Sequence, residues 1–176
     1  MKVFKEEQRF TQTWLIIIVA ISAIGPLAFG VYGSIQQILL KQPFGDKPMS
    51  DLGLIAFTLS MLLLSILIFS FKLKTRIDEK GIHYQFFPFH FSLKTITWSE
   101  INAAKVRTYY PISEYGGWGL RGGFFLNKSK GNAINISGNI GIQLALKNGK
   151  KLLIGTQKKV EAKRVLENYQ NKILFL

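Results

Sequence analysis

Residues 52–71 read LGLIAFTLSMLLLSILIFSF, and residues 72–78, which follow directly, read KLKTRID. The first run carries no charge, and its length suits a helix that crosses the ~30 Å hydrocarbon core of a bilayer. From Leu73 to Asp78 the side chains alternate, as in a strand with one buried face. The sequence therefore predicts a change after Phe71 from a membrane helix to a β-rich domain.

A second uncharged run precedes the first, from Trp14 to Leu40. Residues 41–51 between them hold two prolines and a glycine, which favour a turn. The earlier run is too long for the 7–15-residue apolar core of a signal peptide. We therefore expect residues 1–71 to form a tail and a transmembrane helical hairpin, with spans at 14–40 and 52–71, and residues 72–176 to form a separate domain.

Two features of the first span bear on its shape and packing. Gly25-Pro26 lies in the middle, and proline there predicts a kink. Gly30 and Ser34 form a pair of small residues four apart, which lets another helix approach closely or occurs by chance, since small residues are common in such helices.

Basic residues flank the hairpin on its outer sides, and such residues favour the cytoplasmic side of a membrane. The connecting loop holds only Lys41 and Lys47. The outer flanks hold more, namely Lys2, Lys5, Arg9, Lys72, Lys74, Arg76 and Lys80. The pattern predicts a multi-pass protein of the cell (inner) membrane with both termini in the cytoplasm.

Charge and cysteine content restrict the chemistry of the chain. Its net charge is +13, and residues 72–176 hold 18 basic and six acidic residues, or +12. For a domain tethered to a bilayer, anionic lipid headgroups are a simpler partner than nucleic acid, which we do not expect; plain solubility and topology-setting charge are the alternative. The absence of cysteine excludes disulfides and thiolate chemistry.

Short alternating segments continue through the C-terminal domain. Asn148-Gly149 between two such segments is a strong hairpin signal, and residues 157–174 show an amphipathic helical pattern. About seven antiparallel strands and a C-terminal helix predict an α+β roll or open barrel. The expected strands lie at residues 73–78, 82–87, 93–98, 101–110, 123–126, 133–136, 141–146 and 151–154.

Three segments give the chain a family resemblance: residues 77–82 (IDEKGI), 96–101 (ITWSEI) and 149–157 (GKKLLIGTQ). Together with residues 114–121 and 137–143, they resemble an uncharacterised branch of bacterial two-helix membrane proteins that carry a pleckstrin-homology-like (PH-like) domain. The resemblance covers most of the chain and implies a PH-like fold. It names no activity, and we see no inositol-phosphate signature in these residues.

Motifs for catalysis, metal or cofactor binding do not stand out. The sequence holds no G-x-S-x-G elbow and no phosphate-binding loop G-x-x-x-x-G-K-[ST]. His83 and His90 lie on either side of Pro88, but no acidic residue obviously joins them as a metal ligand. We therefore expect neither an enzyme nor a cofactor.

The glycine-rich run at residues 116–123, GGWGLRGG, is the most unusual segment. Its five glycines permit close backbone approach, Trp118 offers a flat face, and Arg121 offers a fork for carboxylate or phosphate. Glu114 and Tyr115 precede it, which makes these four residues a candidate partner-binding group. Alternatively, the run is a strand-connecting loop with tight turns, and Glu114 pairs with Arg121 inside the fold.

Phe87, Phe89 and Phe91 surround Pro88 and His90. They are candidates for the membrane interface, or alternate members pack in the core. The sequence thus predicts a membrane-anchored, non-enzymatic binding or scaffold protein that contacts a protein partner, a second copy of itself or the anionic lipid surface. The alternative is a subunit of a larger membrane complex, for transport or envelope assembly, whose hairpin packs against other spans.

Overall fold

The computed structural model describes residues 3–10, 12–122 and 131–174. The chain forms two compact units, one made of residues 11–70 and the other of residues 1–10 together with 71–176. We call them the hairpin unit and the β unit. This division differs at the N-terminus from the expected one, because the first ten residues belong to the β unit rather than to a tail beside the helices.

The hairpin unit holds two apolar helical segments, as expected. The first runs through α1 (Thr13–Val19), the π-helical η1 (Ala20–Ile24), α2 (Gly25–Ser34) and the π-helical η2 (Ile35–Leu39), and the second is α3 (Asp51–Ser70). Residues 16–39 and 51–70 are long and apolar enough to cross a membrane by length and composition. Most of their large side chains are exposed within the unit, which suits an apolar solvent.

The first helix continues through Pro26 by widening the turn before it. Proline has no N–H to donate to the carbonyl four residues earlier, and its ring crowds that carbonyl. The helix accommodates the proline through the π-helical turn η1. At its end the Gly25 N–H donates to the Ala20 carbonyl, five residues earlier. Such single π turns are a common response to an interrupted helical ladder.

Gly30 is where α2 meets α3. A Cβ atom on Gly30 would lie 2.6 Å from the Thr58 hydroxyl oxygen, and Ser34 Oγ lies 3.4 Å from the same oxygen. The small pair therefore serves close packing within the hairpin itself. At the connecting loop, Gln37 Nε2 donates to the Met49 carbonyl and to Asp51 Oδ1, which holds the turn at the start of α3.

Sheet A of the β unit is antiparallel, with the order β1-β2-β3-β4. Its strands are β1 (Phe4–Arg9), β2 (Lys72–Asp78), β3 (Gly81–Phe87) and β4 (Lys94–Thr97). We did not expect β1, in which Phe4, Glu6 and Gln8 face inward. Two of these inward residues are polar, so the apolar alternation that reveals a strand is missing from the sequence.

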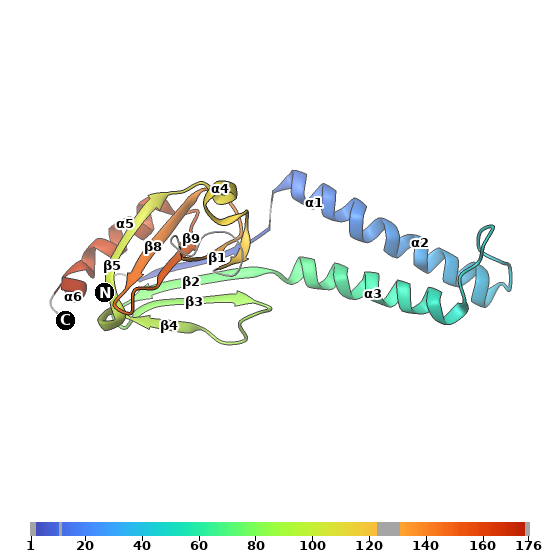
Figure 1. Ribbon diagram of the computed structural model, residues 1–176, viewed down its shortest axis with the longest axis horizontal. Helices are drawn as coiled ribbons and strands as arrows, with labels where there is room; N and C mark the ends of the chain where they lie inside the picture. Colours follow the sequence, from blue (N-terminus) through green and yellow to red (C-terminus); the bar gives the residue numbers. More distant parts are fainter. Residues whose placement is uncertain (1–2, 11, 123–130, 175–176) are drawn as a thin grey trace. The chain divides into compact units, whose positions relative to one another are not determined.

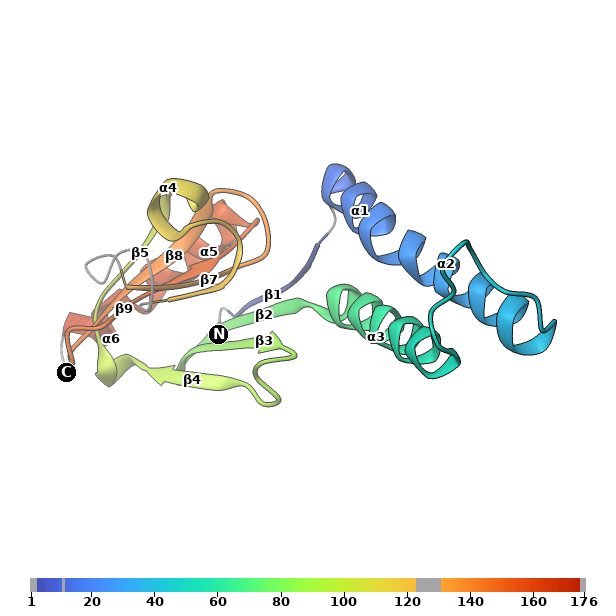
Figure 2. The ribbon, with the colours of Figure 1, turned by 45° about the vertical axis from the view of Figure 1, so that its right-hand side comes forward.

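Sheet B has the order β5-β8-β9-β7-β6. Figure 1 shows β5, β8 and β9 of this sheet, and Figure 2 also shows β7. Its strands are β5 (Ile101–Thr108), β6 (Gly119–Arg121), β7 (Asn132–Asn135), β8 (Ile140–Leu146) and β9 (Lys151–Gly155). The described residues thus form nine strands rather than about seven. The expectation of a wholly antiparallel arrangement is wrong for β7 and β9, which pair in parallel. The expected strand at 123–126 lies outside the described residues.

The inner faces of both sheets share one hydrophobic core with the C-terminal helices. The helix expected at 157–174 is two helices, α5 (Lys159–Asn168) and α6 (Gln170–Leu174), which meet at Tyr169. The Tyr169 ring stacks on Trp98 of η3 (Trp98–Glu100), the short turn that links the two sheets. Both helices contact β5, so they cover one side of the core. The α+β class is confirmed, with strands in two sheets.

β1 is tied to the opposite end of the chain through buried polar groups. Glu6 Oε2 accepts a hydrogen bond from the Thr156 hydroxyl at 2.6 Å, and Glu6 Oε1 accepts one from the Gln157 N–H at 2.8 Å. Gln8 Nε2 donates to the Gly155 carbonyl at 2.8 Å. The N-terminal strand therefore closes the core and fixes the turn that leads into α5.

Candidate functional site

Glu114 and Tyr115 have structural partners on the face of sheet B opposite the core. They end α4 (Pro111–Tyr115), where Glu114 takes a forked contact from Arg107, with oxygen–nitrogen distances of 3.2 and 2.7 Å. Tyr115 is buried, with its ring edge-to-face against Tyr109. Arg107 also donates a hydrogen bond to Gln143 Oε1, which holds the guanidinium in place beside Glu114. The alternative considered from the sequence, a pair between Glu114 and Arg121, differs from the ion pair that forms, in which Arg107 on β5 binds Glu114.

Three glycines of this segment adopt backbone angles that other residues rarely adopt. Gly116 ends α4 in the left-handed region with φ +74°, and Gly117 and Gly119 have φ values of +115° and +113°. Side chains other than glycine are strained at such angles. The half-buried Trp118 donates from Nε1 to the Gly138 carbonyl at 3.0 Å, and Arg121 Nε donates to the Trp118 carbonyl at 3.0 Å. These contacts and backbone angles favour the interpretation of the glycine-rich run as a strand-connecting loop.

The aromatic loop, which we define as residues 87–93, joins β3 to β4. Phe89 is 56% exposed, Phe91 85% and Leu93 48%, whereas Phe87 is half-buried. The loop lies at the end of sheet A where Phe87 pairs with Lys72, and Lys72 in turn pairs with Arg9. At this same end the chain leaves the β unit after Phe10 and returns at Phe71.

Further aromatic rings support the base of this loop. Phe71 lies 5.7 Å from Phe86 and 5.9 Å from Phe89 between ring centroids, and Phe86 and Phe89 stack at 5.8 Å. The Phe10 ring meets Phe71 edge-on. Core packing therefore explains the inner rings of the cluster, but it does not explain the exposure of Phe89 and Phe91.

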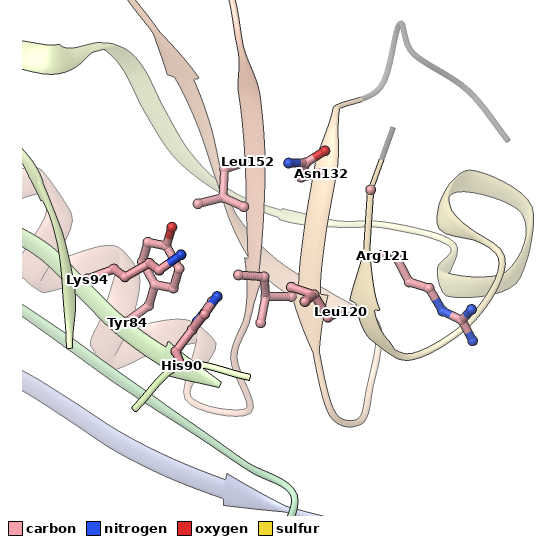
Figure 3. A pocket seen from close by; sticks show the side chains of 9 residues that line it. Tyr84, His90, Lys94, Leu120, Arg121, Asn132 and Leu152 are labelled. Carbon is pink, nitrogen blue, oxygen red and sulfur yellow. The ribbon is translucent and has the colours of Figure 1, made fainter. Parts of the chain in front are cut away.

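A cleft of about 590 Å³ opens between the two sheets. One wall comes from β3, β4 and the aromatic loop, and carries Tyr84, His90 and Lys94 (Figure 3). The other wall comes from β6, β7 and β9, and carries the aliphatic side chains Leu120, Ile134 and Leu152 together with the amide of Asn132.

Arg121 borders the cleft, but its guanidinium points away from it (Figure 3). Glu114, Tyr115 and Trp118 are not among the described lining residues. The structure therefore does not bring the four candidate partner-binding residues together around this concavity. Instead, the cleft gathers three residues that the sequence did not single out for binding. For two of these residues, Tyr84 and Lys94, the sequence held one usable signal, since the expected hairpin of their strands brings them opposite each other.

On the polar wall, the pKa shifts of Tyr84 and His90 favour their neutral forms, which lie beside the ammonium group of Lys94. Burial raises the pKa of the Tyr84 phenol, so the hydroxyl keeps its proton. Burial, and secondarily the positive charge of Lys94, lowers the pKa of His90. His90 Nδ1 accepts a hydrogen bond from the Phe86 N–H at 3.3 Å, which leaves Nε2 to carry the proton of the neutral ring.

The second histidine belongs to a different cluster, at the β2–β3 turn. His83 Nε2 lies 3.0 Å from Asp78 Oδ1, and His83 Nδ1 lies 2.8 Å from the Thr95 hydroxyl. Arg76 completes an ion pair with Asp78 at 2.8 Å. Within residues 3–10, 12–122 and 131–174, no group of three or more metal-ligating side chains is placed to hold a metal ion.

Comparison with known proteins does not assign this chain to a family. The chain matches no protein-family model and no curated protein. The resemblance to PH-like membrane proteins therefore stays a prediction.

Proposed function

We propose that the chain is a membrane-anchored, non-enzymatic binding protein, whose basic β unit contacts the anionic surface of the membrane that its hairpin spans. In this proposal the β unit is PH-like, the membrane is the bacterial cell membrane, and both termini lie in the cytoplasm. The observation that carries it is the exposed aromatic loop at the end of sheet A where the chain passes into the hairpin.

The composition of this end suits the headgroup layer. Aromatic and aliphatic side chains such as Phe89, Phe91 and Leu93 favour the boundary between headgroups and acyl chains. Basic side chains beside them are attracted to anionic lipids, each by about 1 kcal/mol near the surface. Lys72 and Arg9 supply such charges, and Lys72 Nζ lies 5.6 Å above the Phe87 ring.

Strand pairing supports the proposed topology independently of the charge pattern. β1 precedes the first apolar helix and β2 follows the second, yet the two pair along their whole length from Phe4–Ile77 to Arg9–Lys72. Paired strands lie on the same side of a bilayer. Two membrane crossings between them satisfy this condition, and a single crossing would not.

Depth measurements at single spin labels would test the contact. The natural chain has no cysteine, so each introduced cysteine is unique. We would label Phe91→Cys in the full chain, reconstituted in nanodiscs that contain anionic lipid. Matched controls are Ile112→Cys on α4 and Val160→Cys on α5, since these apolar side chains are 71% and 80% exposed.

Power saturation should show the label at position 91 shielded from an aqueous relaxant and accessible to oxygen, with both control labels in water. Neutral lipid should reduce the depth at position 91. Equal aqueous exposure at all three positions would overturn the proposed membrane contact.

The alternative, a subunit of a larger membrane complex, has less support. The small pair that was a candidate for contact with another span is occupied by Thr58 of the same hairpin. Another protein would need a different face of the helices.

A further inference from the structure

The two walls of the inter-sheet cleft differ in kind. Tyr84 and Lys94 face each other on neighbouring strands, and His90 reaches over from the aromatic loop, with its ring centroid 5.7 Å from that of Tyr84. All three side chains point into the cleft (Figure 3). Opposite them, Ile134 and Leu152 are almost fully buried, and Leu120 is 44% exposed at the rim.

Charge is one-sided in this space. None of the nine described lining residues is acidic, and Lys94 brings an ammonium group to the polar wall. Tyr84 and His90 add an O–H and an N–H donor beside it. A group that accepts hydrogen bonds and carries negative charge complements this wall, and an aliphatic chain complements the wall opposite.

We propose that the inter-sheet cleft is a binding site for an anionic amphiphile, that is, an acyl chain with a carboxylate or phosphate head. The head lies against Lys94, Tyr84 and His90, and the chain lies against the aliphatic wall formed by Leu120, Ile134 and Leu152. The cleft volume of about 590 Å³ falls within the range of roughly 300–1,000 Å³ that is usual for small-molecule sites.

Two sources could supply this chemistry, a free fatty acid or an anionic phospholipid drawn from the bilayer. The inference goes beyond the proposed membrane contact, because the cleft would bind a free fatty acid whether or not the aromatic loop enters the membrane. His90 belongs to that loop, between the exposed Phe89 and Phe91, so a loop at the bilayer surface would bring the cleft beside its lipid supply.

Photo-crosslinking of the full chain in nanodiscs of neutral lipid would test the site. The probes are palmitic acid, palmityl alcohol, phosphatidylglycerol and phosphatidylcholine, each with a diazirine in its acyl chain. Labelled peptides would be mapped by mass spectrometry. We expect the acid to label Leu120 and the peptides of β7 and β9 on the order of tenfold more than the alcohol does, and all four probes to label the helical hairpin.

Variants separate the two walls. Lys94→Gln should lower acid labelling of the cleft on the order of tenfold, which corresponds to about 1.4 kcal/mol of binding free energy. Leu120→Gln, at a rim position that tolerates polarity, should lower it as well. Lys159→Gln on α5, which also removes one exposed lysine, should leave it unchanged. Hairpin labelling and melting temperature would show that each variant is folded.

The outcomes discriminate. Cleft labelling by the acid alone assigns the site to a free fatty acid, and labelling by phosphatidylglycerol but not phosphatidylcholine assigns it to bilayer lipid. The proposal would be overturned by cleft labelling that distinguishes neither acid from alcohol nor phosphatidylglycerol from phosphatidylcholine, by an unchanged Lys94→Gln variant, or by labelling confined to the hairpin. Because the spin-label depth is read at position 91 and crosslinking at the cleft, failure of one proposal is distinguishable from failure of the other.

Discussion

Glu114 illustrates how a residue with the chemistry of a binding group becomes a structural one. Its side chain is only 14% exposed, and it receives a forked contact from Arg107 and the Tyr110 N–H. A half-buried, multiply bonded pair differs from a surface ion pair, which contributes roughly 0–1 kcal/mol. Loss of the Glu114 carboxylate leaves the charge of the partly buried Arg107 poorly compensated.

We predict that Glu114→Gln lowers the free energy of unfolding by about 1.5–3 kcal/mol, as is usual for hydrogen bonds to charged groups. Glu161→Gln is the matched control, because its pair with Lys158 is loose, at 3.6 Å, and exposed. Thermal melting of the full chain in mild detergent would compare them. Equal stability of the two variants would contradict a structural role for Glu114.

Asp78 gives the β unit an acid-sensitive anchor. Burial of this carboxyl raises its pKa, but the hydrogen bonds from His83 and the Lys80 N–H and the charges of His83 and Arg76 outweigh burial, so the pKa is lowered below its ordinary 3.8. A group with a lowered folded pKa contributes stability that is fully present above its unfolded pKa and is lost as pH falls through the folded value.

We therefore predict that Asp78→Asn destabilises the chain at pH 7, and that the gap from the unmodified chain narrows as pH falls below about 4. Melting temperatures between pH 7 and pH 3 would show this convergence. Glu79→Gln, which removes an exposed neighbouring carboxyl, is the control and should have nearly the melting temperature of the unmodified chain at pH 7. A gap that stays constant with pH would show that the ionised form of Asp78 is not the stabilising one.

At the scale of elements, the hairpin depends on close approach of α2 and α3 at Gly30. A leucine there would place its Cβ 2.6 Å from the Thr58 hydroxyl oxygen and push the helices apart. We predict that Gly30→Leu lowers the melting temperature and raises protease sensitivity of the hairpin in detergent. Gly25→Leu is the control, since a Cβ at that position would meet no side chain or other helix within 4 Å. Similar behaviour of the two variants would argue against this helix contact.

β1 contributes a core residue, Phe4, and a paired edge to the β unit. Without it, the buried Phe4 is lost from the core and the edge of β2 is unpaired. Residues 71–176 alone should therefore be aggregation-prone. Because Arg9 pairs with Lys72, an Asn-Gly turn between Phe10 and Phe71 should join β1 and β2 as a tight hairpin.

We predict that this joined form, residues 3–10, Asn-Gly and 71–176, is monomeric and melts cooperatively in water without detergent, whereas residues 71–176 alone do not. Size-exclusion chromatography and circular dichroism would distinguish them. An equally stable fragment without β1 would show that the N-terminal strand is dispensable.

At the scale of the whole molecule, the pairing of β1 with β2 sets a condition that any membrane topology must meet. In the proposed topology, the loop at residues 41–50 and the β unit lie on opposite sides of the bilayer. We predict that a membrane-impermeant maleimide labels Asp46→Cys on intact cells but labels Lys159→Cys only after permeabilisation. Both positions are exposed within their own units. The reverse pattern would invert the proposed orientation, and labelling of both on intact cells would exclude it.

Local patterns in the sequence determined much of this architecture. The uncharged runs near 14–40 and 52–71 predicted both apolar helices, and alternation predicted strands within β2, β3, β4, β5, β7, β8 and β9. Asn148-Gly149 predicted the hairpin of β8 and β9, where Gly149 has φ +80°. These features depend on neighbours along the chain, so hydropathy period and turn chemistry are enough to reveal them.

Only the tertiary structure decided the rest. The pairing of β1 with β2, the parallel pairing of β7 with β9, and the meeting of Tyr84 and Lys94 with Leu120 across the cleft all join residues that lie far apart in the chain. The inward position of Glu6 could not be predicted from the sequence, because its hydrogen-bond partners, Thr156 and Gln157, come from the other end of the chain. A buried polar group is stable only where such partners meet it, and the fold alone brings them together.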